Sequence, residues 1–335
     1  MNLSNVQTSQ LPIKLAITDA GNSDHGLGML YPLIEVLKRN FDIELTSLED
    51  ADVLFYGDFG VRHHDFKGIK VFFTGENHQA YWNACDYAFT HELKDSNRHM
   101  RMPYYAHVLL NDPASLSLLQ SRPMITHEDL ERHPRKFCNF VYRNHVGSVR
   151  NRFFEKLSKY KHIDSAGPFL NNMNGYMVPK GFQNNRIFAS QYKFTISFEN
   201  ESHLGYTTEK ITHPLLGRSV PIYWGDKNVV EDFNSKSFIN YFDFDSEDDL
   251  IDFIIQVDQD DDLLLQYLNA PCFESGLSPY LDEQRYMKRF EEIFHQRTIR
   301  RTGTQQFFFK LGRYVGRPAF DRYRAYRRIK RDRVK

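Results

Sequence analysis

The chain has 335 residues, of which 41% are apolar and 26% are charged, and these ordinary values exclude a disordered or collagen-like chain. Lysine plus arginine and aspartate plus glutamate both number 43, so the net charge is zero and the total favours no class of partner. The length suits two ordinary domains or one large one.

The first part of the chain predicts strands that alternate with a helix. The helix is expected over 27–40, because apolar residues recur there at positions 30, 33, 34 and 37 with helical spacing. Short apolar runs bounded by polar residues predict the strands Ile13–Thr18, Asp52–Tyr56, Ile69–Phe73 and Asp86–Phe89. This alternation favours a parallel α/β sheet.

The alternation restarts after a polar, proline-containing stretch over 113–134, which we interpret as the connection between two domains. Beyond it, the pattern predicts strands over Lys136–Tyr142, Tyr192–Phe198 and Val220–Tyr223, and helices over Val149–Tyr160, Thr207–Leu216, Ser246–Val257 and Pro279–Arg297. Ser246 is the expected N-cap of its helix. Two consecutive α/β units predict two Rossmann-like domains that face each other across a cleft.

The charges are unevenly distributed along the chain. Residues 297–335 carry a local balance of +12, so the rest of the chain carries −12. Aromatic residues are interspersed among these cations, a pattern typical of a segment that lies on an anionic membrane surface. We therefore expect a basic C-terminal tail over 301–335 that associates with such a surface.

Cysteine spacing and hydropathy bear on the cellular compartment. Cys85, Cys138 and Cys272 are widely spaced, which argues against a disulfide framework and against a cysteine zinc site. Residues 1–10 lack the pattern of a signal peptide, and nowhere do 18 apolar residues follow one another. These features predict a soluble or peripheral protein in a reducing compartment.

The densest functional signal lies between the strand that ends at Phe198 and the helix that follows. Its sequence is Phe198-Glu199-Asn200-Glu201-Ser202-His203-Leu204-Gly205-Tyr206-Thr207-Thr208-Glu209-Lys210. In open α/β sheets, ligands bind at the carboxyl ends of the strands. The start of a helix together with Lys210 would hold an anion such as a diphosphate, Glu209 could accept hydrogen bonds from ribose hydroxyls, and Tyr206 could stack on a base.

A second signal is Val71-Phe72-Phe73-Thr74-Gly75-Glu76-Asn77, in which an apolar strand delivers a carboxylate at its end. Glu76 is placed as a general base would be, facing whatever the other domain binds, although an acid that caps a loop is an alternative interpretation.

These motifs resemble the α-1,3-fucosyltransferases of glycosyltransferase family 10, and the bacterial members most of all. The donor-side likeness is carried by the Phe198–Lys210 motif with Ile211 and by Val220-Pro221-Ile222-Tyr223-Trp224-Gly225, and the acceptor-side likeness by Thr74-Gly75-Glu76-Asn77, Cys85-Asp86-Tyr87-Ala88 and Arg101-Met102-Pro103-Tyr104-Tyr105. The chain departs from the family at His78-Gln79-Ala80-Tyr81-Trp82, where members often have Pro-Asp-Phe, and at Thr207, where Val is commoner.

The resemblance implies a GT-B fold with an acceptor-binding Rossmann-like domain over 1–130 and a GDP-fucose-binding one over 131–300. It implies metal-independent, inverting transfer of fucose from GDP-fucose to an N-acetylglucosamine hydroxyl of an N-acetyllactosamine-type glycan. The charge of the basic tail adds the expectation that the protein is peripheral on the inner face of a bacterial cytoplasmic membrane. Glu76 falls on the family's general base, Arg150 and Lys210 on diphosphate contacts, and Asn200, Tyr206 and Glu209 on nucleotide and ribose contacts. No cofactor is implied, since GDP-fucose is a substrate.

Other interpretations remain open at this point. The chain could make an α-1,4 link, make both links, or use another GDP-sugar. A nucleic-acid-binding protein would explain the basic tail, but the acidic remainder of the chain argues against it. The Asp-x-Asp sequences Asp243-Phe244-Asp245 and Asp258-Gln259-Asp260 lie at helix edges or in an acidic run, so we expect no metal site.

Overall fold

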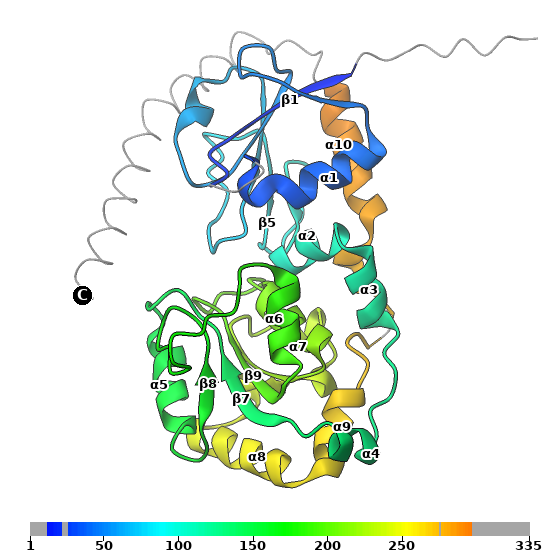
Figure 1. Ribbon diagram of the computed structural model, residues 1–335. Coiled ribbons are helices and arrows are strands. Elements are labelled where there is room, and N and C mark those ends of the chain that lie inside the picture. The colour runs from blue at the N-terminus through cyan, green and yellow to red at the C-terminus, as the bar shows by residue number, and fades with distance from the viewer. Residues whose placement is uncertain (1–11, 22–25, 275, 297–335) are drawn as a thin grey trace, which may run out of the picture.

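The computed structural model describes residues 12–21, 26–274 and 276–296 as two α/β domains (Figure 1). The strands are β1 (Ile13–Thr18), β2 (Ile43–Leu45), β3 (Val53–Tyr56), β4 (Ile69–Phe73), β5 (Tyr87–Thr90), β6 (His99–Arg101), β7 (Lys136–Phe140), β8 (Ile163–Ser165), β9 (Tyr192–Phe198), β10 (Val220–Trp224) and β11 (Ile239–Asn240). The α-helices are α1 (Tyr31–Asn40), α2 (Tyr104–Leu110), α3 (Pro113–Gln120), α4 (His127–Arg132), α5 (Ser148–Leu157), α6 (Phe182–Ala189), α7 (Glu209–Gly217), α8 (Glu247–Gln259), α9 (Asp261–Asn269) and α10 (Glu283–His295). Short 3-10 helices are η1 (Gly28–Leu30), η2 (Arg62–Asp65), η3 (Val229–Glu231), η4 (Ser235–Ser237), η5 (Tyr241–Asp243) and η6 (Pro279–Leu281).

Each domain is built on a parallel sheet, which confirms the expected pair of Rossmann-like domains. The N-terminal sheet has the order β2-β1-β3-β4-β5-β6 and the C-terminal sheet the order β11-β10-β9-β7-β8. In both sheets the strand order reverses beside the first strand, between β1 and β3 and between β7 and β9. Such a reversal opens a crevice at the carboxyl ends of the strands, where ligands bind.

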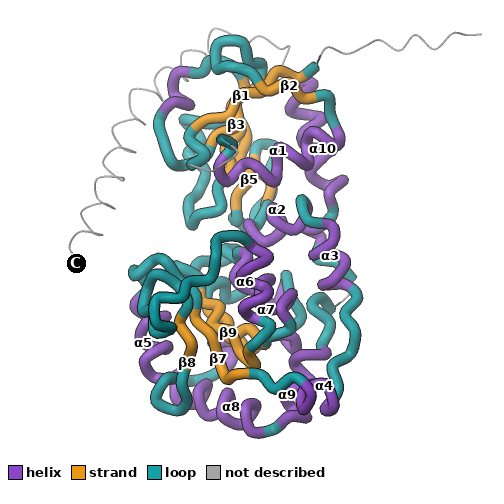
Figure 2. Tube along the Cα trace, viewed as in Figure 1, coloured by secondary structure: helices purple, strands orange, loops and turns teal. Residues whose placement is uncertain are grey.

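In the C-terminal domain, helices cover both faces of the sheet (Figure 2). Apolar residues of α5, α8 and α9 pack on one face of its sheet, and α7 packs on the other. In the N-terminal domain, α1 and α10 cover one face. The opposite face is closed mainly by loop residues such as Phe66. Strands buried on both faces explain why β3 and β4 are nearly continuous apolar runs.

Two helices lie in the stretch that the sequence predicts to be only a polar connection. Helix α3 has Pro113 in its first turn and the side chain of Asp112 as its N-cap, and α4 begins with a capping box between Thr126 and Asp129. Each capping side chain accepts one N–H in the first turn of its helix, which helps short polar segments to become helical without a sustained apolar stripe. The expected N-cap at Ser246 is confirmed, since its side chain accepts from the N–H of Asp249.

Helix α10 lies on the N-terminal domain, although the range 131–300 was expected to belong to the C-terminal one. Its buried residues Tyr286, Met287, Phe290, Ile293 and Phe294 join the core formed by α1 and the N-terminal sheet. The last described helix therefore returns across the junction and closes the first domain (orange in Figure 1). The amphipathic pattern predicts a buried face but not which sheet buries it.

The basic tail over 301–335 lies outside the described residues, so its association with a membrane stays a prediction. Within the described ranges, no helix combines the length and the apolarity that crossing a membrane requires.

Replacing Phe290 with Ala is expected to destabilise the N-terminal domain by about 3–5 kcal/mol, the usual loss for a buried aromatic side chain. Its ring centroid lies 4.5 Å from that of Phe89 and 5.8 Å from that of Phe55. Urea unfolding monitored by near-UV circular dichroism measures the change, and exposed Glu291→Ala is the control. A loss no larger than that of the control would contradict the placement of α10.

Candidate active site

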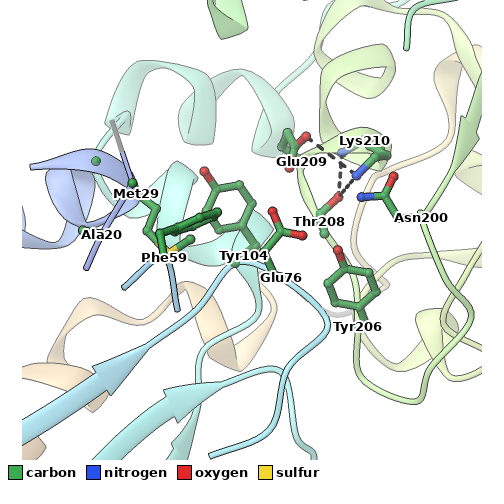
Figure 3. A pocket seen from close by; sticks show the side chains of 13 residues that line it. Ala20, Met29, Phe59, Glu76, Tyr104, Asn200, Tyr206, Thr208, Glu209 and Lys210 are labelled. Carbon is green, nitrogen blue, oxygen red and sulfur yellow. Dashed lines mark hydrogen bonds and ion pairs between the residues drawn. The ribbon is translucent and has the colours of Figure 1, made fainter. Parts of the chain in front are cut away.

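A cavity of about 580 Å³ lies between the two domains and is lined by residues of both. The N-terminal domain contributes residues that follow β1, β3 and β4 and the start of α2, and the C-terminal domain contributes the β9–α7 connection. The lining residues are Ala20, Gly21, Gly28, Met29, Phe59, Gly75, Glu76, Tyr104, Asn200, Tyr206, Thr208, Glu209 and Lys210. Figure 3 shows Glu76 and Tyr104 facing Thr208 and Lys210 across this space.

Glu76 is held at the carboxyl end of β4 by its own loop. Its N–H donates to the Oγ1 of Thr74 at 2.9 Å. Gly75 is required before it, because a Cβ there would come within 2.5 Å of the Tyr104 ring. Burial raises the pKa of the Glu76 carboxyl, the carboxylate of Asp58 adds to the rise, and the ammonium of Lys210 opposes it. A carboxylate with a raised pKa in a cavity has the properties of a general base.

Lys210 lies at the start of α7 between two carboxylates. Its Nζ is 2.9 Å from Glu199 Oε2 and 4.0 Å from Glu209 Oε1. Burial alone would lower the pKa of Lys210, but these two acids outweigh it and hold the pKa well above its ordinary value. Lys210 is therefore a fixed cation on the cavity wall.

Glu199 anchors the start of α7 from the end of β9. Its fully buried carboxylate accepts hydrogen bonds from the N–H of Thr208 at 2.8 Å and from the Thr208 hydroxyl, in addition to its contact with Lys210. Burial raises the pKa of Glu199, and Lys210 opposes this rise. By fixing Thr208 and Lys210 together, Glu199 keeps the polar wall of the cavity in one arrangement.

Arg150 stands one layer behind the cavity rather than in its lining. It is fully buried in α5 with its guanidinium over the Tyr142 ring, 4.0 Å from the centroid. One Nη donates to Asn200 Oδ1 at 3.3 Å and the other to the carbonyl of Asn144 at 2.5 Å. Gly147 leaves the room, since a Cβ there would lie 2.9 Å from the guanidinium. Arg150 thus reaches the cavity through Asn200.

Polar contacts join the domains beside the cavity. Arg101, at the end of β6, makes a bidentate ion pair with Asp232, which follows η3, at 2.8 and 2.7 Å, and both side chains are at most 2% exposed. Nearer the cavity, Asn77 Nδ2 donates to Glu201 Oε2 at 2.8 Å. The loop that carries Glu76 is therefore connected directly to the loop that carries Asn200.

Two family models match the chain and together span well over half of it. The model described as "Glycosyltransferase family 10 (fucosyltransferase) C-term" matches residues 130–271, and that of the "Alpha-(1,3)-fucosyltransferase FucT N-terminal domain" matches residues 28–108. The chain belongs to glycosyltransferase family 10. The predicted family and the enzyme class, a glycosyltransferase, are thereby confirmed.

Individual relatives of this family 10 chain agree with the match. The α-(1,3)-fucosyltransferase FucT of Helicobacter pylori is 35% identical over 250 residues, which cover 65% of this chain and 51% of that protein. The GDP-fucose protein O-fucosyltransferase 3 of Xenopus laevis is 28% identical over 254 residues, covering 68% and 52%. The chain thus spans about half the length of these curated relatives.

Solved structures of an α1,3-fucosyltransferase match over most of both chains. The crystal structure of that enzyme aligns with a TM-score of 0.72 and 26% identity, covering 86% of this chain and 92% of the other. The same enzyme with GDP-fucose gives a TM-score of 0.71 at 26% identity, covering 87% and 93%. The expected GT-B fold of this family 10 chain is confirmed.

The structure brings most of the predicted site residues together. Glu76, Asn200, Tyr206, Glu209 and Lys210 line one cavity, so the two motifs do share a crevice. Tyr206 lines the cavity but is only 3% exposed. Its ring packs edge-on against the ring of His91 from the N-terminal domain, with 5.3 Å between the ring centroids. The roles assigned to these residues in catalysis and donor binding stay predictions.

Sequence reasoning missed several residues of this family 10 site. Glu199 stands inside the quoted motif, and its place directly after an apolar strand and beside Asn200 was a usable signal. Met29, Phe59 and Tyr104 form the apolar wall of the N-terminal half of the cavity. No local pattern marks Met29 or Phe59, which follow different strands, whereas Tyr104 stands in the motif Arg101-Met102-Pro103-Tyr104-Tyr105 but was assigned no role there.

Metal binding was not expected, and the described residues contain no cluster of three or more His, Cys, Asp or Glu side chains placed to hold an ion. Metal independence itself stays a prediction.

Replacing Asp232 with Leu is expected to destabilise the protein by about 3–5 kcal/mol, because the buried guanidinium of Arg101 would lose its counter-ion. The double variant Arg101→Met/Asp232→Leu removes both charges and should recover much of that loss. Equilibrium urea unfolding of the three variants, including Arg101→Met alone, measures the coupling. Losses that simply add in the double variant would show that the pair does not act as a unit.

Proposed function

We propose that the protein is an inverting α-1,3-fucosyltransferase that moves L-fucose from GDP-fucose to an N-acetylglucosamine hydroxyl of an N-acetyllactosamine-type glycan, giving a Lewis-type product. The observation that carries the proposal is the cavity that places Glu76 of one domain opposite Lys210 of the other. The relatives named above support the donor and the linkage, since one is an α1,3-fucosyltransferase crystallised with GDP-fucose.

The C-terminal wall has the chemistry of a nucleotide-diphosphate site. Lys210 is a partly buried cation at the N-terminus of α7, where the helix dipole also favours an anion. Asn200, oriented by Arg150, and Glu209 add polar groups that can bind a ribose or a diphosphate. As GDP leaves, negative charge develops on its diphosphate. A cation that is already in position stabilises this charge in the transition state, where it develops.

The N-terminal wall suits the sugar acceptor. Met29, Phe59 and Tyr104 give it an apolar surface, and Glu76 lies at the border between this surface and the donor side. The apolar face of a pyranose ring can pack on such aromatic side chains while one of its hydroxyls reaches the carboxylate.

The proposed reaction is a single displacement. The acceptor hydroxyl attacks the anomeric carbon of fucose, Glu76 takes the hydroxyl proton, and the bond from that carbon to the diphosphate oxygen breaks with its electron pair leaving on GDP. Attack from one domain and departure toward the other place the two groups on opposite faces of the sugar, which gives inversion. Proton removal by a positioned base contributes roughly 10²–10⁴ in rate.

Incubating the protein with a panel of acceptors and, in separate reactions, GDP-fucose or another GDP-sugar such as GDP-mannose tests the proposal. The panel comprises N-acetyllactosamine, lactose, a Lewis-type glycan whose O4 is the free position, and a serine- or threonine-containing protein substrate. Linkage and anomeric configuration are read by NMR. An α-1,3 link on N-acetyllactosamine supports the proposal, whereas an α-1,4 link, a protein product, or transfer only from another GDP-sugar contradicts it.

Glu76→Gln is expected to lose roughly 10²–10⁴ in turnover while GDP-fucose affinity is kept. Because the pKa of Glu76 is raised, the base is protonated and inactive below that pKa, so kcat/KM should fall with decreasing pH in the wild type. This limb should be absent from the residual activity of the variant. Initial rates across pH, with donor binding followed by calorimetry, provide the measurement, and unchanged turnover would remove Glu76 from the role.

Lys210→Ala and Arg150→Ala are expected to weaken GDP binding, Lys210→Ala more strongly because its ammonium lines the cavity and Arg150 acts through Asn200. For Lys210→Ala, loss of one charge-assisted contact corresponds to about 1.5–3 kcal/mol, or roughly tenfold to a hundredfold in affinity, and the indirect contact of Arg150 should cost less. Titration calorimetry with GDP measures both, and exposed Lys159→Ala is the control. Normal GDP affinity in both variants would refute the diphosphate assignment.

A further inference from the structure

A second carboxylate lies behind the loop that carries Glu76. Asp58 is separated from the end of β3 by Gly57, and its side chain is only 4% exposed. Its Oδ2 accepts a hydrogen bond from the hydroxyl of Thr74 at 2.8 Å and is in direct contact with Nδ1 of His78. Thr74 and His78 stand on either side of Glu76, so a single oxygen of Asp58 holds both ends of the short loop.

The contact continues to the backbone of Glu76 itself. The Oγ1 of Thr74, which donates to Asp58, accepts the N–H of Glu76 at 2.9 Å, and the N–H of His78 donates to the carbonyl of Glu76 at 2.7 Å. Hydrogen bonds in such a chain polarise one another. The position of the Glu76 carboxylate therefore depends on Asp58 through two separate connections.

We propose that Asp58 is a positioning residue for the transfer reaction, which fixes Glu76 through Thr74 and His78 and places a second carboxylate behind it. This proposal rests on the role of Glu76 as the base given above. A loop anchor alone would not require a buried carboxylate, because an asparagine could accept the same hydrogen bond. The other oxygen, Oδ1, is buried and has no hydrogen-bond partner among the described residues, so the charge is only partly compensated locally.

The negative charge of Asp58 acts on the basicity of Glu76. Burial is the main reason that the pKa of Glu76 is raised, and Asp58 is the next contributor. Three further groups change the pKa of Glu76: His78 in the same loop, and Glu209 and Lys210 of α7. Glu76 in turn raises the pKa of Tyr104 in α2 and of Tyr206 in the β9–α7 connection. Lys210 and His78 lower the pKa of Glu76, so Asp58 counteracts the cation that the donor diphosphate requires.

Two substitutions separate the charge of Asp58 from its hydrogen bond. Asp58→Asn keeps an acceptor for Thr74 but removes the charge. We expect the acidic limb of kcat/KM to move to lower pH by roughly half to one unit, with kcat at the plateau falling about two- to threefold as the base weakens. Thr74→Val keeps the charge but cuts the connection to the Glu76 N–H, so kcat should fall while the limb stays where it is.

A control variant and a binding measurement separate a specific role of Asp58 from a general effect of substitution. Asp65→Asn removes an exposed carboxylate of η2 and should change neither quantity, and GDP affinity should be unchanged in all three variants. The proposal would be overturned if the pH profiles of kcat/KM for the wild type and Asp58→Asn coincided. It would also be overturned if Thr74→Val kept the wild-type kcat, and this second result is decisive if Asp58→Asn does not fold. A Glu76→Gln variant that keeps turnover and the acidic limb would instead refute the proposed function of Glu76.

Discussion

The buried ion pair between Arg101 and Asp232 is the interaction on which the active site depends, because it joins the two sheets whose strand ends form the cavity. Each domain alone supplies half of a site, one with a carboxylate and an apolar wall and the other with a cation. Arg101 also donates to the carbonyls of His91 and Gly205, so it connects a strand end of the first domain with the β9–α7 connection of the second. A bidentate pair fixes orientation as well as distance, which a purely apolar junction does less well.

Each charged group on the cavity wall has other charged groups beside it that set its charge or its pKa. The charge of Lys210 is balanced by Glu199 and Glu209, which allows a partly buried cation at the start of α7. A diphosphate would then compete with these carboxylates for the ammonium. On the other wall Glu76 keeps a raised pKa although Lys210 shares its cavity, because burial and Asp58 act against the cation. Burial thus raises the pKa of Glu76, whereas Lys210 stays charged against the effect of burial because of Glu199 and Glu209.

Much of this arrangement follows from local pattern. The strand limits at Ile69–Phe73 and Tyr192–Phe198 agree with the structure, because apolar runs bounded by polar residues mark buried parallel strands. Glu76 and Lys210 could be assigned to one crevice because both follow such strands at the carboxyl edge. Contacts between distant segments could not be predicted. Tertiary packing determines three such features. They are the ion pair between Glu199 and Lys210, the position of Arg150 behind Asn200, and the packing of α10 on the first domain.

The central claim is that Glu76 removes a proton during a displacement driven by departure of GDP, and chemical rescue tests it most directly. Glu76→Ala should be slow with a glycan acceptor but should release GDP faster when azide is added, because azide is already an anion and needs no base. The product should be fucosyl azide with the anomeric configuration inverted relative to GDP-fucose, as NMR can show. Failure of azide to increase GDP release, or a product with retained configuration, would contradict the account.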